Sequence, residues 1–113
     1  MIEFDKFWRD KVHPLQGKTI NTLDQNIENK ILSVTPEYLE RKSTKNEHSR
    51  KQKIKKEVFE EIFDLLKKEG ILTRIQINKR YKGWRSSVIT SILAKNEDHI
   101  KYTTKPLTLY WKR

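Results

Sequence analysis

The chain has 113 residues, of which 35% are hydrophobic and 35% are charged, and its formal net charge is +10 at pH 7. This length suits one main hydrophobic core and is too short for two full-sized cores. The 10% share of aromatic residues argues against a wholly disordered chain, and the absence of cysteine excludes disulfides and thiolate metal sites. The N-terminus does not resemble a signal peptide, and no apolar run approaches the roughly 20 residues that span a bilayer. We therefore expect a cytoplasmic protein that does not contact membranes.

The positive charge is concentrated in the later part of the chain. Residues 1–40 hold five Lys or Arg against seven Asp or Glu, whereas residues 41–113 hold twenty against eight. A surplus of this size on so small a body attracts polyanions. The charge therefore favours nucleic acid as the partner, contacted by residues after position 40.

The first forty residues predict a short helix and a small β-meander. Apolar residues recur at helical spacing from Phe4 to Val12, and Pro14 ends the pattern because proline cannot continue a helix. Three segments with strand-like composition follow, separated by turn signals: 19–22, 31–34 and 38–41. We expect an antiparallel meander of these strands, which together with the helix forms an N-terminal subdomain over residues 1–41.

Residues 42–56 are polar apart from Ile54, and the stretch from Arg41 to Lys56 has eight positive residues and one negative. This composition predicts a basic linker that becomes helical towards its end. Its cations would act as an electrostatic arm, because each phosphate that they neutralise releases counterions. The arm consists of Arg50, Lys51, Lys53, Lys55 and Lys56. A flexible linker without a partner is the alternative interpretation.

Two helices are predicted at the start of the last part of the chain. Residues 58–66 carry an apolar stripe with i, i+3, i+4 spacing, and Gly70 supplies the stop of this first helix. Thr73 and Gln76 form a capping-box pattern, in which each side chain bonds the backbone of the other residue. The second helix should therefore begin at about Arg74.

A third helix and a terminal hairpin complete the predicted elements. Gly83 allows the chain to reverse after the second helix, and apolar spacing predicts a third helix over residues 85–94. Residues 99–102 and 107–111 alternate like strands, with the turn signal 103–106 between them. The simplest arrangement of these two strands is a hairpin.

The order of elements from residue 57 onward resembles the winged helix-turn-helix superfamily. In this resemblance residues 71–73 are the small first strand, residues 73–81 and 85–94 are the helices of the motif, and residues 101–111 are the wing. The resemblance covers about half of the chain and depends on the order of the elements. We therefore expect an α+β fold, in which a short N-terminal helix and a small antiparallel meander precede a winged helix-turn-helix of three helices and a terminal hairpin, over residues 57–113.

The resemblance implies that the third helix enters a major groove of double-stranded DNA. Its apolar side chains would face the core, and its opposite face would contact the bases. That face carries Arg85, Ser86, Ser87, Thr90, Ser91 and Lys95. Phosphate contacts would come from Arg74, Lys79, Arg80 and Lys82 beside the helices and from Lys105 at the tip of the wing. A solvated helix face without a ligand is the alternative interpretation.

The sequence offers no pattern typical of catalysis, metal binding or a cofactor. His13, His48 and His99 are far apart in the chain and match no metal-binding motif, and the three glycines cannot form a phosphate-binding loop. We therefore expect a protein that is not an enzyme and binds no metal or cofactor.

The expected function is nucleic-acid binding, with DNA favoured over RNA, in transcription regulation or as an accessory protein of a mobile element. The N-terminal subdomain would supply a second contact surface, a homodimer interface or a dock for a protein partner. The alternative is a protein-interaction adaptor or an RNA-binding module that uses the same winged-helix surface.

Overall fold

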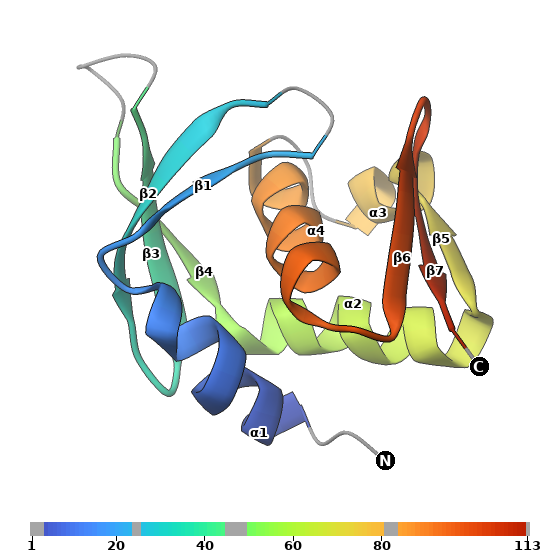
Figure 1. The fold of residues 1–113 in the computed structure, drawn as a ribbon, viewed down its shortest axis with the longest axis horizontal. Helices are drawn as coiled ribbons and strands as arrows, with labels where there is room; N and C mark the ends of the chain where they lie inside the picture. The colour runs from blue at the N-terminus through green and yellow to red at the C-terminus, as the bar shows by residue number, and fades with distance from the viewer. Residues whose placement is uncertain (1–3, 24–25, 45–49, 81–83, 113) are drawn as a thin grey trace.

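Two antiparallel sheets lie on either side of a central helix, α4 (Trp84–Asn96), and a second long helix, α2 (Lys56–Glu69), runs beneath it (Figure 1). The computed structural model describes residues 4–23, 26–44, 50–80 and 84–112, and for Trp84 and Arg85 it describes the backbone alone. Within these ranges no helix is both long and apolar enough to cross a membrane.

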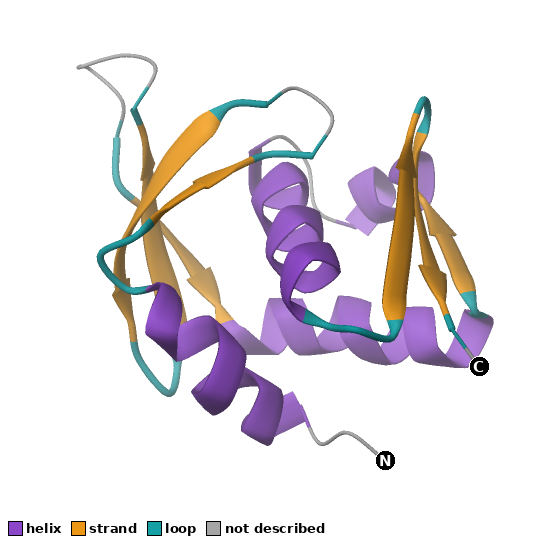
Figure 2. Ribbon diagram, in the orientation of Figure 1, coloured by secondary structure: helices purple, strands orange, loops and turns teal. Residues whose placement is uncertain are grey.

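The elements confirm an α+β fold with helices between the two sheets (Figure 2). Before α2 the chain forms α1 (Phe4–Phe7), the π-helical turn η1 (Trp8–Val12), the 3-10 turn η2 (His13–Leu15), β1 (Thr19–Asn21), β2 (Glu28–Val34), β3 (Tyr38–Ser43) and β4 (Gln52–Lys55). After α2 it forms β5 (Ile71–Thr73), α3 (Arg74–Arg80), α4, β6 (Ile100–Thr104) and β7 (Leu107–Trp111).

The first sheet has the strand order β1-β2-β3-β4, so the predicted three-stranded meander is present and gains a fourth strand. That strand, β4, pairs with β3 and sets Ile54 opposite Leu39. The prediction of a linker over residues 42–56 is wrong where β3 extends to Ser43 and where β4 forms. The composition of residues 52–55 does not indicate a strand, because a strand with one buried face needs few apolar residues. Ile54 is the single aliphatic core residue of β4.

The second part of the chain confirms the predicted end of α2 and the predicted start of α3. Gly70 has φ +85°, and its N–H donates to Leu66 O at 2.7 Å, which closes α2. The Gln76 N–H donates to Thr73 Oγ1 at 3.2 Å, while the Thr73 N–H donates to Gln76 Oε1 at 2.8 Å. This reciprocal pair is the predicted capping box. The predicted terminal hairpin is β6-β7, and β5 pairs with β7, so the second sheet has the order β5-β7-β6.

One hydrophobic core connects the N-terminal helix to the later half of the chain. The ring of Phe63 on α2 lies 5.2 Å from Phe4 and 5.9 Å from Phe7, between centroids, and Trp8 meets Phe59 edge-on at 5.2 Å. All five rings are buried and belong to one contiguous cluster that also includes residues of α4 and of both sheets. The N-terminal segment and α2 therefore pack as one unit.

Candidate nucleic-acid interface

The polar face of α4 is buried, and this corrects the prediction that it contacts DNA. Ser86, Ser87, Thr90 and Ser91 each have an exposed fraction of 1% or less. Thr90 Oγ1 donates to Ser86 O at 2.9 Å, Ser91 Oγ donates to Ser87 O at 2.6 Å, and Ser86 Oγ donates to Asn78 Oδ1 at 2.7 Å. Hydroxyl groups that bond the carbonyl four residues back need no water, so polar residues could enter the interior. These four side chains are not available to bases.

The first sheet supplies the cover over α4. The Leu23 N–H, just after β1, donates to Ser91 Oγ at 3.0 Å, and Lys95 Nζ donates to Asn21 O at 3.0 Å. Lys95 is exposed but is bound to the strand that covers its own helix. Figure 1 shows α4 enclosed between β1 and the second sheet. The helix expected to enter a DNA groove is an internal helix of this fold.

The other predicted DNA contacts are divided between two ends of the molecule. Lys79 and Arg80 are exposed on α3, and Lys105 is exposed at the turn of the terminal hairpin. Arg74 is half-buried, and its Nη2 donates to Ser87 Oγ at 2.7 Å. Three further predictions, Lys82, the turn at Gly83 and the side chain of Arg85, lie outside the described residues. In Figure 1 α3 and the hairpin are at the opposite end of the molecule from β4, so the predicted set does not form one surface.

Lysines gather instead on the outer face of the first sheet. Alternation along β4 buries Ile54 and leaves Lys53 exposed on the outside. On β3, Glu40 pairs with Lys53 and therefore lies on the same face of the sheet. Lys42 follows Glu40 by two residues, so Lys42 lies on that face as well. Lys30 on β2 lies directly opposite Lys42. We call Lys30, Lys42 and Lys53 the basic sheet face.

Like charges oppose one another on this face. Side chains directly opposite in an antiparallel pair are close, and two charges of the same sign there are destabilising. Neither Lys30 nor Lys42 forms an ion pair within the described part of the chain. Glu40, which is half-buried, is the acid placed opposite Lys53. Glu28 and Glu40 share this face, each two residues from one of the lysines along its own strand, so the direct opposition at positions 30 and 42 is a repulsion that these acids reduce in part and that a bound anion would relieve further.

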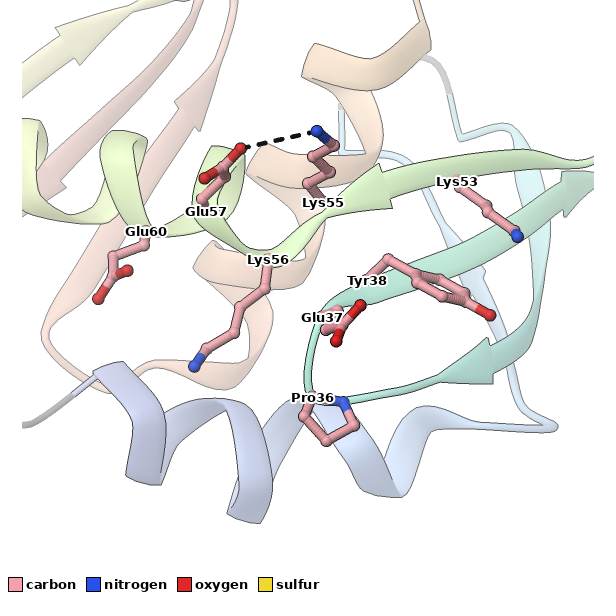
Figure 3. A pocket seen from close by; sticks show the side chains of 8 residues that line it. All are labelled: Pro36, Glu37, Tyr38, Lys53, Lys55, Lys56, Glu57 and Glu60. Atoms are coloured by element: carbon pink, nitrogen blue, oxygen red, sulfur yellow. Dashed lines mark ion pairs between the residues drawn. The ribbon is translucent and has the colours of Figure 1, made fainter.

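The predicted basic arm divides between this face and the α2 junction. Arg50 and Lys51 are exposed and lead into β4, so they extend the charge of the basic sheet face. Lys55 points towards Glu57, with Nζ and Oε1 4.0 Å apart, in an exposed pair worth little energy (Figure 3). Lys56 belongs to α2 and is ion-paired with Asp5 of α1. Lys56 therefore serves the packing of α1 rather than a ligand.

An open groove of about 550 Å³ lies where β3, β4 and α2 meet (Figure 3). Three lysines and three glutamates line it together with Pro36 and Tyr38, so its formal charges cancel. Lys53 Nζ lies 4.7 Å from the centroid of the Tyr38 ring and covers one side of it. With balanced charges and an occupied ring face, this groove is a weak candidate for an anion or base site.

Arg41, which the sequence places in the basic run, belongs to the interior. It is 6% exposed; its Nη1 donates to Asn29 Oδ1 at 2.8 Å and its Nε to Gln52 Oε1 at 3.0 Å. Both partners are neutral, and burial lowers the pKa of the Arg41 guanidinium from its ordinary value. Arg41 therefore connects β2, β3 and β4 and does not reach a ligand.

Sequence reasoning missed Lys30 and Lys42 as a pair. Lys30 lies in the acidic part of the chain and Lys42 in the segment taken for a linker. The usable signal was the alternation in residues 28–34, where Asn29 and Ile31 are buried and Lys30 is exposed between them. Only the register between β2 and β3 brings the two lysines together.

Among the described residues, no group of three or more His, Asp or Glu side chains is arranged to hold a metal ion. Comparisons with protein-family models, with curated proteins and with solved structures give no match to this chain.

Proposed function

We propose that the protein is a nucleic-acid-binding protein without catalytic activity, and that it holds duplex DNA through phosphate contacts made by the basic sheet face. The observation that carries this proposal is the placement of Lys30 directly opposite Lys42. A phosphate between them would replace repulsion with charge-assisted contacts and release counterions. Such contacts supply affinity without reading bases, so we expect binding that tolerates sequence changes.

We further propose that residues 56–111 form a winged helix-turn-helix. The order α2, β5, α3, α4, β6, β7 supports this, as does the pairing of β5 with the terminal hairpin. In this proposal α4 takes the position of the recognition helix. Because β1 covers α4, the N-terminal sheet occupies the side from which DNA would approach, and the binding surface lies on the outside of that sheet.

The test is the single substitution Lys30→Glu. It places opposite charges across from each other, so the free energy of unfolding should rise by about 0.2–1 kcal/mol. At the same time it removes a phosphate contact, so the affinity for a labelled duplex in fluorescence anisotropy should fall by about tenfold at low salt. Greater stability together with weaker binding separates a lost contact from a damaged fold.

The matched control is Lys101→Glu, an exposed lysine of β6 on the second sheet, which changes the net charge equally. It should leave duplex affinity nearly unchanged. Equal losses in both variants would mean that net charge alone drives binding, and unchanged affinity in Lys30→Glu would overturn the proposed surface. Titrations with single-stranded DNA and RNA, each at several salt concentrations, identify the preferred nucleic acid, and phosphate-dominated binding must weaken steeply as salt rises.

A further inference from the structure

A second surface of different chemistry lies on α3, at the end of the molecule away from the basic sheet face (Figure 1). Ile75 on α3 is 70% exposed, and Ile71 on the preceding strand is 45% exposed. A groove of about 380 Å³ between α2 and α3 borders α3 and is lined by Leu65, Glu69, Leu72, Gln76, Lys79 and Arg80. We call Ile71, Ile75 and this groove the α3 surface.

The exposed isoleucine is bordered by cations. Ile75 and Lys79 are four residues apart on α3, as are Gln76 and Arg80, so each pair lies on one side of the helix. Within the described part of the chain neither Lys79 nor Arg80 forms an ion pair. The α3 surface therefore combines an exposed aliphatic side chain with two cations and one acid, Glu69, which leaves one formal positive charge in excess.

This combination fits a protein partner better than nucleic acid. An exposed aliphatic side chain is stabilised by losing its contact with water to other apolar groups, at about 25 cal/mol per Å² buried. Phosphate groups are charged and hydrated, so a nucleic acid bound here would leave the Ile75 side chain in contact with water. A second copy of the chain is also disfavoured here, because each copy carries a net charge of +10 and the α3 surface is itself basic.

We propose that the α3 surface docks an acidic amphipathic helix of a partner protein. The apolar stripe of that helix would cover Ile75 and enter the groove beside Leu72, while its carboxylates would face Lys79 and Arg80. This inference stands on α3 alone and does not depend on the proposed contact with DNA. Together the two surfaces would make the protein an adaptor between a nucleic acid and an acidic partner.

The test uses a fluorescein-labelled synthetic peptide of about 18 residues, long enough to form a helix, with leucines on one face and glutamates on the other. Two comparison peptides replace every glutamate by lysine, or shuffle the sequence so that the apolar stripe is lost. The acidic amphipathic peptide should bind the full chain at least about tenfold more tightly than either comparison peptide, as measured by fluorescence anisotropy.

Two variants locate the binding. Ile75→Ser should weaken peptide binding by about tenfold, and its exposed position should leave the fold intact. Lys79→Glu combined with Arg80→Glu should weaken it at least as much. Lys30→Glu, on the other end of the molecule, should leave peptide binding unchanged.

Four results would overturn the inference. The first is equal binding of the three peptides, and the second is full peptide affinity retained by Ile75→Ser. The third is a loss of duplex affinity in Ile75→Ser, which would assign the α3 surface to nucleic acid. The fourth is a wild-type dimer that Ile75→Ser dissociates in sedimentation velocity, which would make the occupant a second copy. If the DNA proposal fails, Lys30→Glu will retain its affinity for duplex DNA. That result would not change the expected peptide binding, so the two failures can be told apart.

Discussion

Arg41 joins three strands from the inner side of the first sheet. Its planar guanidinium donates to the side chains of Asn29 on β2 and Gln52 on β4 at the same time. A lysine ammonium is a compact point charge on a flexible stem and cannot present the same fork of donors. The residue type therefore matters here beyond its charge.

Arg41→Lys should lower the free energy of unfolding by about 1–3 kcal/mol, because one of the two amide oxygens loses its donor inside the protein. Urea denaturation monitored by tryptophan fluorescence measures this change. The control is Lys42→Arg at the next, half-buried position, where the change should stay within about 0.5 kcal/mol. Equal stability of Arg41→Lys and wild type would show that the fork has no structural role.

At the scale of one element, α4 shows how a polar helix becomes internal. Every residue from 86 to 94 is buried, although four of these nine are Ser or Thr. Their hydroxyl groups find partners in the helix's own carbonyls, in Arg74 and Asn78 of α3 and in the turn after β1. A helix with satisfied hydroxyls can pack against two sheets at once, which leaves no face for a groove of DNA.

Ser91→Ala tests the contact between α4 and the first sheet. The substitution removes the acceptor of the Leu23 N–H, which is part-buried, and should destabilise the protein by about 1–3 kcal/mol. Native-state hydrogen exchange should show faster exchange of the Leu23 amide. Ser33→Ala, whose hydroxyl has no partner among the described residues, is the matched control and should change stability by less than about 0.5 kcal/mol. Equal changes in stability and in Leu23 amide exchange in the two variants would show that the hydrogen bond from Leu23 to Ser91 does not stabilise the protein.

At the scale of the whole molecule, the aromatic residues of α1 and η1 complete the core beneath α2. Phe4, Phe7 and Trp8 contact Phe63 and Phe59, and the Trp8 Nε1–H also donates to Thr35 O at 2.8 Å. Removing the first part of the chain would expose these rings of α2 to water. The domain boundary predicted at residue 57 therefore does not separate two hydrophobic cores.

A fragment of residues 56–113 should not fold by itself, although the proposed winged helix-turn-helix lies within it. The loss of three buried aromatic side chains, each worth about 1.5–3 kcal/mol on burial, exceeds what so short a chain can spare. The expected result is a poorly dispersed NMR spectrum without a cooperative urea transition, and addition of a peptide of residues 1–55 should restore dispersion. A cooperatively folding fragment would establish an independent domain.

The elements that the sequence predicted correctly depend on neighbours within a few residues. The apolar stripe of α2, the stop at Gly70, the capping box of Thr73 with Gln76 and the terminal hairpin are all of this kind. Their backbone geometry and end hydrogen bonds are made by side chains close in the chain. The sequence therefore determined these elements and the α+β class.

The tertiary structure decided which faces are buried and which side chains meet. The strand β4, the cover over α4 and the opposition of Lys30 to Lys42 all depend on contacts between residues at least eleven positions apart. A serine or lysine in the sequence does not reveal whether its side chain is hydrogen-bonded or ion-paired to a residue far away in the chain. The sequence by itself thus determined that the chain is basic, where α2 ends and where α3 begins, while long-range packing decided that α4 is internal and that Lys30, Lys42 and Lys53 share one face of the first sheet.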